Sequence, residues 1–212
     1  MDLRYPVTRL FYRRLSAPMA VLLARTPVTP IQVTWVSAAF AVAGAAAFAL
    51  SEYTLGAILT FIGAITDCAD GDLARMTGRT SSWGAFLDSV LDRWTDAAMI
   101  LGLAFSDPDD LAAIGGLALT GSLLTSYTRA RAQSLGVDCP DGIGGRDARI
   151  LILVVAALLG QVFAGLLVVT ITSAVTAVHR LAVAGRALRR VEERAAKAGE
   201  TGAGTPPGTP PR

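Results

Sequence analysis

The chain has 212 residues, of which 52% are hydrophobic, and its mean hydropathy is +0.50. This composition is too apolar for an ordinary soluble domain and indicates an integral membrane protein. The formal net charge is only +2, but the 19 Lys and Arg residues cluster beside apolar segments, which argues against a nucleic-acid partner. The two cysteines, Cys68 and Cys139, are expected to be free thiols, because they do not suggest a disulfide framework.

The amino-terminal segment 5–24 predicts a helix that lies flat at the membrane interface. Its large apolar residues fall on one side: Leu10, Phe11, Leu15, Met19 and Leu22. Arg9, Arg13 and Arg14 interrupt the apolar pattern and would face anionic lipid headgroups. No secretory signal peptide is expected, because arginines punctuate this segment and no small-residue cleavage site follows an apolar core.

Six apolar stretches follow, each close to the length of about 20 residues that a membrane-spanning helix needs. They are placed at 32–50, 55–76, 83–105, 111–135, 148–164 and 166–188. The connections on one side carry the Lys and Arg residues, and those on the other side carry none. The positive-inside rule therefore places the basic side and both termini in the cytoplasm.

The sequence thus predicts an all-α, multi-pass protein of the cell membrane in three parts. The first, 1–30, is the interfacial helix with a linker, and the second, 31–190, is a domain of six transmembrane helices. The third, 191–212, is a polar tail that is expected to be disordered, because it has too little apolar surface to offset its ordering entropy.

Four aspartates lie inside the second and third predicted spans. Asp67 and Asp70 are three residues apart and share a helix face, and Asp88 and Asp92 share another at a spacing of four. A short connection containing Gly78 would make the two helices antiparallel neighbours, so that four carboxylates converge near the cytoplasmic end. Each charge costs about 2.5–3.5 kcal/mol in a membrane helix on insertion scales. Like charges also repel, and a divalent cation resolves both problems.

The ligand chemistry predicts which cation binds. An all-oxygen set without a cluster of His or Cys suits Mg²⁺ or Mn²⁺ rather than Zn²⁺. Four carboxylates suffice for two ions that clamp an attacking and a leaving oxygen. The alternative is a structural ion-pair network, but intramembrane carboxylates usually mark function. Asp96 continues the stripe one turn beyond Asp92, where it either supports the site or pairs with Arg93, whereas Asp72 points away from the shared face.

Small residues accompany these carboxylates. Gly71, Ala74 and Gly84 each lie about one helical turn or less from an aspartate, and they would let either a large ligand or a neighbouring helix approach closely. Arg75 adds a fixed positive charge that suits a diphosphate.

The pattern D-x-x-D-G-x-x-A-R-x8-G-x3-D-x3-D, from Asp67 to Asp92, resembles the signature of the CDP-alcohol phosphotransferase family. The resemblance implies a homodimer with a site that faces the cytoplasm and releases CMP. It implies metal ligation by Asp67, Asp70 and Asp88, with Asp92 as the fourth ligand and the base that deprotonates the attacking hydroxyl. A set of residues would border the donor, CDP-diacylglycerol or CDP-archaeol: Ile31, Gln32, Val33, Thr34, Gly71, Ala74, Arg75, Ser81 and Gly84. Relatives usually carry Asp or Asn at the position of Ile31.

A second group of basic residues lies at the cytoplasmic ends of the later spans: Arg129, Arg146, Arg149 and Arg180. Arginines bind phosphate through bidentate contacts, so this group predicts a phosphorylated acceptor; the other interpretation is positive-inside anchoring. With the run 126–133, these arginines resemble those of phosphatidylinositol-phosphate and archaetidylinositol-phosphate synthases. That resemblance implies inositol 1-phosphate as the acceptor, with glycerol 3-phosphate as the alternative.

Two other classes of protein use intramembrane aspartates. A prenyltransferase holds diphosphate with Mg²⁺, but its Asp pairs usually lie in two separate repeated motifs, whereas both pairs here fall within 67–92. A cation transporter needs carboxylates near the middle of the membrane and a path to both sides. Here the aspartates lie toward one side and no inverted repeat is evident.

Overall fold

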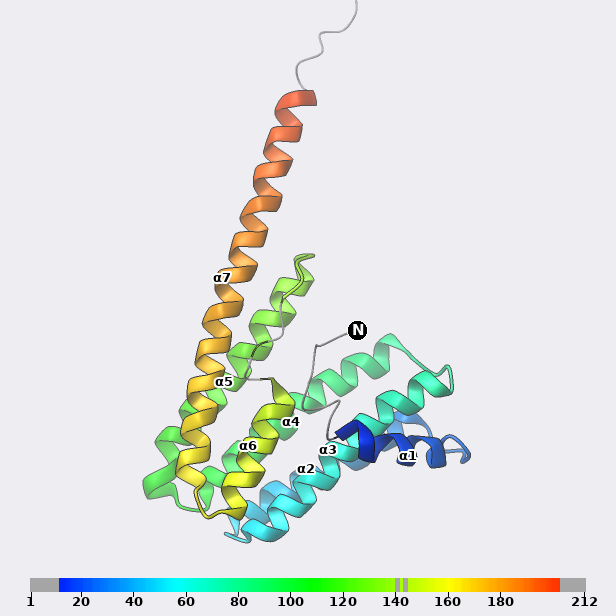
Figure 1. The fold of residues 1–212 in the computed structure, drawn as a ribbon, viewed down its shortest axis with the longest axis vertical. Coiled ribbons are helices and arrows are strands. Elements are labelled where there is room, and N and C mark those ends of the chain that lie inside the picture. Colours follow the sequence, from blue (N-terminus) through cyan, green and yellow to red (C-terminus); the bar gives the residue numbers. More distant parts are fainter. Residues whose placement is uncertain (1–11, 140–141, 143–144, 203–212) are drawn as a thin grey trace, which may run out of the picture.

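The computed structural model describes residues 12–139, 142 and 145–202, and the regular elements in that part of the chain are all α-helices (Figure 1). In chain order they are α1 (Arg13–Leu23), α2 (Pro30–Ala49), α3 (Tyr53–Met76), α4 (Ser82–Phe105), α5 (Pro108–Ser134), α6 (Arg146–Leu158) and α7 (Val162–Gly202). The predicted all-α fold is therefore confirmed. Both cysteines are free, as predicted.

Three of the described helices, α2, α5 and α7, are long and apolar enough to cross a membrane. This agrees with the prediction of a membrane protein. Helices α3 and α4 have 24 residues each but contain the aspartates, and α6 has only 13 residues. The count of six spans consequently stays a prediction.

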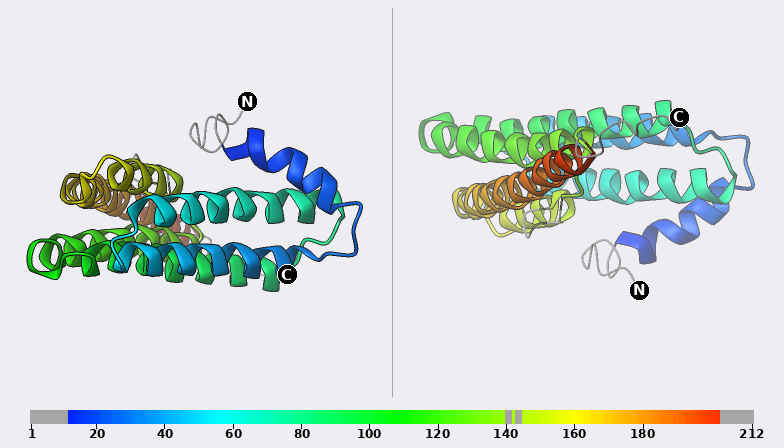
Figure 2. Two further views of the ribbon diagram at one scale, coloured as in Figure 1. Left: turned by 90° about the horizontal axis from the view of Figure 1, so that it is seen from below. Right: turned by 90° about the horizontal axis from the view of Figure 1, so that it is seen from above.

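Helix α2 is the common support of the aspartate-bearing helices. Both α3 and α4 pack extensively against α2, and they pack far less closely against each other. The two helices are neighbours across the carboxylate cluster rather than in direct backbone contact, and the turn between them contains Gly78 at a φ of +66°. Views from below and above show α2 and α3 running side by side (Figure 2).

Glycines explain why α2 can lie so close to both partners. A Cβ atom at Gly102 of α4 would overlap the backbone carbonyl of Ala45 on α2. A Cβ atom at Gly44 of α2 would lie 2.5 Å from Thr60 Oγ1 on α3. Because both backbones approach α2 at positions without side chains, α3 and α4 are held on one support with a gap between them.

The second half of the chain packs beside the first. Helix α5 contacts α4 and α7, and α6 contacts α3 and α7. One buried apolar cluster joins these helices, and its largest fully buried members are Tyr12, Phe48, Ile100, Leu103, Leu153 and Leu166. The continuous core thus joins residues of α2, α3, α4, α5, α6 and α7.

Helix α1 packs along α3, with a small and polar face turned inward. Tyr12, Ser16 and Ala20 are almost fully buried, whereas Leu15 and Leu22 are exposed. Burial, and to a smaller extent the nearby Asp147 carboxylate, raises the pKa of Tyr12 to about 12, so this phenol stays protonated. The exposed apolar residues suit a helix that rests on lipid; residues 5–11 of the predicted interfacial helix lie outside the described residues.

Helix α7 is longer than the predicted span 166–188. It has 41 residues and extends well beyond the other helices at the top of Figure 1. It continues to Gly202, so the predicted disordered tail at 191–212 begins too early; the run is rich in Ala, Arg and Glu, which are strong helix formers. The turn before α7 also comes a few residues earlier than predicted, at Gly160 with a φ of +66°. Residues 203–212 lie outside the described part.

Candidate active site between two cavities

Three aspartates form a compact cluster where α3 faces α4. One carboxylate oxygen each from Asp67, Asp70 and Asp88 lies within 4.8 Å of the other two. Asp67 and Asp70 project from one face of α3, and Asp88 reaches them from α4 across the gap. Asp92 lies one turn further along α4 and is not part of this group of three.

The start of α2 holds the most buried member of the cluster. Thr34 Oγ1 donates a hydrogen bond of 2.5 Å to Asp70 Oδ2, and both residues are buried. Thr34 is held in turn by a capping box: the Gln32 N–H donates to Thr29 Oγ1, and the Thr29 N–H donates to Gln32 Oε1. The pattern Thr-x-x-Gln at 29–32 is a sequence signal for this cap that the sequence analysis missed.

A cavity of about 410 Å³ opens between the start of α2 and the facing ends of α3 and α4, and we call it the α2–α4 groove. Its lining consists of Thr29, Pro30, Ile31, Thr34, Asp70, Gly71, Ala74, Arg75, Arg79, Thr80, Ser81, Gly84, Ala85 and Asp88. Seven of the nine predicted donor contacts are in this set. Gln32 and Val33 are not, because the Gln32 side chain completes the cap and Val33 is buried.

The edge of the α2–α4 groove is shaped by a helix cap and a weak ion pair. Ser81 Oγ accepts a hydrogen bond of 3.0 Å from the Gly84 N–H and so caps the start of α4. Arg75 donates to Asp72 at 2.7 Å, and Asp72 also accepts from Ser16 on α1. The Arg75 side chain is 59% exposed, so this pair contributes little stability and leaves the guanidinium at the cavity.

A second cavity, of about 440 Å³, lies on the other side of the carboxylates, and we call it the arginine pocket. Its lining consists of Asp67, Arg75, Asp88, Asp92, Arg93, Asp96, Thr125, Ser126, Arg129, Gly142, Gly145, Arg146, Asp147, Arg149 and Arg180. All four predicted acceptor arginines are therefore brought to one cavity, although they come from α5, α6 and α7. The two cavities share Arg75 and Asp88, and they meet at the carboxylate cluster.

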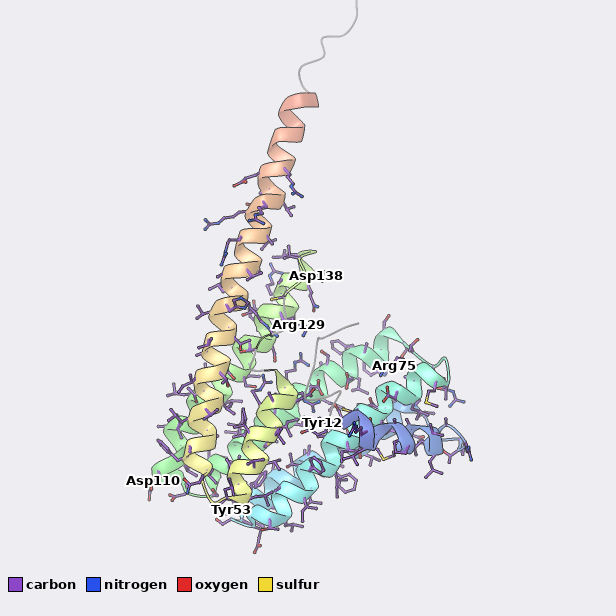
Figure 3. The ribbon with its side chains drawn as sticks, viewed as in Figure 1. Tyr12, Tyr53, Arg75, Asp110, Arg129 and Asp138 are labelled. Atoms are coloured by element: carbon purple, nitrogen blue, oxygen red, sulfur yellow. The ribbon has the colours of Figure 1, made fainter. Side chains whose placement is uncertain are left out.

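Both cavities lie away from the end of the bundle that carries Tyr53 and Asp110. In the side-chain view, Arg75 and Arg129 lie near the middle height of the molecule, well above Tyr53 and Asp110, which mark its lower end (Figure 3). The four predicted acceptor arginines lie on the same side, since all of them line the arginine pocket.

Arg146 links the arginine pocket to the carboxylates. Its Nη1 lies 2.6 Å from Asp67 Oδ2 and 2.8 Å from Asp92 Oδ1, and its Nε lies 3.4 Å from Asp96 Oδ1. Arg146 was predicted only as a phosphate contact, so its position among three carboxylates is a finding of the tertiary structure.

The structure also decides between the two alternatives for Asp96, which were support of the site and pairing with Arg93. Arg149 Nη2, rather than Arg93, donates to Asp96 at 2.5 Å. Arg93 instead donates to the Ser89 carbonyl at 2.6 Å and lies 3.4 Å from Asp92. The pairing of Asp96 with Arg93 is therefore wrong, and Asp96 belongs to the site.

The fourth predicted arginine is anchored by the α5–α7 contact. Arg180 is buried, and its Nη1 donates a hydrogen bond of 2.7 Å to the Thr125 carbonyl. The Thr125 hydroxyl donates in turn to the Ser173 carbonyl of α7 at 3.0 Å. This pair of contacts ties the two helices together at the wall of the arginine pocket.

The carboxylate oxygens of the cluster fit a divalent cation. Three carboxylates with oxygens within 4.8 Å of one another are the hard, anionic ligands that such ions prefer. Asp92 Oδ1 adds a buried acceptor that has no hydrogen-bond partner in the described part of the chain, since its contact with Arg146 is an ion pair without hydrogen-bond geometry. A cation near these oxygens would offset the repulsion among the three carboxylates and would also give Asp92 Oδ1 a partner.

An all-helical membrane protein with a carboxylate cluster between two cavities fits the class of membrane-embedded, metal-dependent enzymes. The family model described as CDP-alcohol phosphatidyltransferase matches residues 27–187. The chain belongs to this family, as the spacing of the aspartates predicts.

Individual relatives agree with this assignment. The chain is 38% identical over 156 residues to a phosphatidylinositol phosphate synthase of Streptomyces avermitilis, which covers 70% of the chain and 64% of the relative. It is 35% identical over 168 residues to an archaetidylinositol phosphate synthase of Pyrococcus horikoshii, covering 75% and 85% of the two chains. The chain thus spans less than two thirds of the Streptomyces protein.

Solved structures of the phosphatidylinositol phosphate synthase of Mycobacterium tuberculosis have the same fold. The form with CDP-DAG bound superimposes with a TM-score of 0.73 at 28% identity, covering 81% of this chain and 94% of that one. The form in complex with manganese and citrate superimposes with the same TM-score and identity, covering 80% and 88%.

Proposed function

We propose that the protein transfers a phosphatidyl-type group from a CDP-linked lipid to a hydroxyl of inositol 1-phosphate and releases CMP. The observation that carries the proposal is the contact between the two cavities. The α2–α4 groove and the arginine pocket meet at Asp88 and Arg75, beside the carboxylate cluster. A donor in one cavity and an acceptor in the other would have their reacting atoms close together, which removes much of the entropic barrier of a two-substrate reaction.

The α2–α4 groove is proposed to hold the CDP part of CDP-diacylglycerol or CDP-archaeol. Gly71, Ala74 and Gly84 leave room for a ligand in the groove, because none carries a side chain larger than a methyl group. Arg75 lies where the two cavities meet and supplies positive charge to a diphosphate. A relative of the same fold is known with CDP-DAG bound, which supports this donor.

Asp67, Asp70, Asp88 and Asp92 are proposed to hold two Mg²⁺ or Mn²⁺ ions. When bound, such ions would neutralise the diphosphate and stabilise the charge that develops on the CMP leaving group. The form of the Mycobacterium tuberculosis relative in complex with manganese supports a divalent cation. Thr34 orients Asp70 in this arrangement, because its hydroxyl donates to the buried carboxylate.

Asp92 is proposed to be the catalytic base. It lines the arginine pocket, where the acceptor is proposed to bind, and its buried Oδ1 forms an ion pair with Arg146 but accepts no hydrogen bond from the described residues. The acceptor hydroxyl oxygen would form a bond to the lipid-linked phosphorus, while the diphosphate P–O bond breaks and CMP leaves. The hydroxyl proton would pass to Asp92.

The arginine pocket is proposed to bind the phosphate of the acceptor through Arg129, Arg146, Arg149 and Arg180. Four guanidinium groups around one cavity favour an anionic acceptor over free inositol. The similarity to phosphatidylinositol phosphate and archaetidylinositol phosphate synthases supports inositol 1-phosphate in preference to glycerol 3-phosphate.

The protein is proposed to cross the membrane six times, with the site and both termini in the cytoplasm. It is also proposed to form a homodimer. The distribution of arginines supports the orientation, since the ends of the bundle differ in positive charge. Helices α3, α4 and α6 would be tolerated in the membrane because their charged residues face the site instead of lipid.

The test is an assay of purified protein with labelled CDP-diacylglycerol and a panel of acceptors. Release of CMP and formation of a phosphorylated lipid product are expected with inositol 1-phosphate, and not with free inositol. Preferential use of glycerol 3-phosphate would replace the proposed acceptor. Absence of CMP release with every acceptor and divalent ion would overturn the proposed function.

A further inference from the structure

Asp96 lies outside the aspartates of the family signature, but it is one of the most densely paired charges in the protein. Its side chain is only 7% exposed, and it lies one turn beyond Asp92 on α4. Arg149 Nη2 lies 2.5 Å from Oδ2, Arg146 Nε lies 3.4 Å from Oδ1, and Ser122 Oγ lies 3.4 Å from Oδ2. This carboxylate therefore connects α4 to both α5 and α6.

The two arginines share this carboxylate because of their spacing. Arg146 and Arg149 are three residues apart in the first turn of α6, so their side chains leave the helix on the same face. Each takes a different oxygen of Asp96, and Arg146 also extends to Asp67 and Asp92. Asp96 thus contacts both guanidinium groups, and the closer contact is the one to Arg149.

The buried Arg149 guanidinium requires a charged partner. The Arg149 side chain is only 3% exposed, and a buried guanidinium is stable only with a charged and hydrogen-bonded partner. The contact of 2.5 Å with Asp96 is a charge-assisted hydrogen bond of the strong kind. Loss of the negative charge of Asp96 would remove this charge-assisted contact and weaken the hold on Arg149.

We propose that Asp96 is a positioning residue that holds Arg149 at the wall of the arginine pocket, beside Arg146, in the geometry that binds the acceptor's phosphate. The inference rests on the proposed function and deepens it. Asp96 touches none of the reacting atoms in this scheme; it acts through Arg149. The effect of Asp96 should be confined to the acceptor, because Asp96, Arg146 and Arg149 line the arginine pocket. None of them lines the α2–α4 groove.

The test is Asp96→Asn, which keeps the shape of the side chain and removes its charge. The KM for inositol 1-phosphate is expected to rise at least about tenfold, since a charge-assisted contact that orients the binding group is lost. The KM for CDP-diacylglycerol is expected to stay within about twofold. Asp110→Asn, at the opposite end of the bundle, is the matched control and should leave both constants unchanged.

A double-mutant cycle separates positioning from a general loss of packing. If Asp96 acts through Arg149, Asp96→Asn and Arg149→Gln together should raise the acceptor KM little more than the stronger single change does. Full additivity of the two effects would contradict the inference. An unchanged acceptor KM in folded Asp96→Asn would overturn it outright.

A second variant and a binding measurement cover the case in which Asp96→Asn does not fold. Asp96→Glu keeps the charge but displaces it by one methylene, so the acceptor KM should rise while the donor KM does not. Protection of the protein against thermal unfolding by inositol 1-phosphate should fall in this variant, whereas protection by CDP-diacylglycerol should persist. Equal loss of both would show a structural role only. An inactive wild-type protein would overturn the proposed function instead, so the two failures are distinguishable.

Discussion

Replacement of Asp92 by asparagine tests the chemical role of the carboxylate cluster most directly. The change keeps the volume of the side chain but removes its basicity. General base catalysis contributes about 10²–10⁴-fold to a rate, so transfer should fall by at least about a hundredfold. Binding of CDP-diacylglycerol should change little, because Asp92 does not line the α2–α4 groove.

The structure also indicates that Asp92→Asn will not release Arg146. That guanidinium keeps its contacts of 2.6 Å to Asp67 and 3.4 Å to Asp96. The loss of rate should therefore reflect the base and the ligand at position 92 rather than a collapse of the arginine pocket.

The assay is single-turnover release of CMP from labelled CDP-diacylglycerol at saturating acceptor and divalent ion, with equilibrium binding of the donor measured alongside. Asp110→Asn is the control for an aspartate that is remote from the cavities. Transfer by Asp92→Asn at the rate of the wild type would refute the assignment of the base. A loss of donor binding as large as the loss of rate would show that position 92 serves the donor.

Three further predictions concern the metal, its supporting hydrogen bond and helix packing. Chelation of divalent ions should reduce transfer at least about a hundredfold, with recovery on addition of Mg²⁺ or Mn²⁺; undiminished turnover would contradict the metal site. Thr34→Val removes the donor to Asp70, so the metal concentration for half-maximal activity should rise about 10- to 100-fold in a titration, and an unchanged midpoint would contradict this. Gly102→Ala should lower the free energy of unfolding by about 1–3 kcal/mol, because the new Cβ would overlap the Ala45 carbonyl. Gly116→Ala, where a Cβ has open space, should not destabilise; equal effects in detergent unfolding would show that the α2–α4 contact is not tight.

Much of the helical organisation could be predicted because it follows from local pattern. The lengths of the apolar runs place α2 to α5 to within a few residues of their ends. Likewise, the spacing of Asp67 and Asp70 is sufficient to place both carboxylates on one face of α3. The run of arginines outside the apolar stretches predicts which end of the bundle is basic.

Other features depend on contacts between distant parts of the chain. The gap between α3 and α4 exists because both helices pack on α2 at glycines, whereas a short connection alone suggests that they pack on each other. The face of α1 that packs on α3 carries Ser16 and Ala20, beside the buried Tyr12 that precedes the helix, whereas Leu15 and Leu22 are exposed.

The sequence by itself determined the family, the helices and the chemical identity of the carboxylates, because these depend on residue types at fixed spacing along a helix. Only the tertiary structure decided which charges meet. Arg146 reaches Asp67 across 79 residues of sequence, and Arg149 reaches Asp96 across 53. No periodicity encodes such pairs, since they form only when α6 packs against α3 and the core brings its first turn to the cluster.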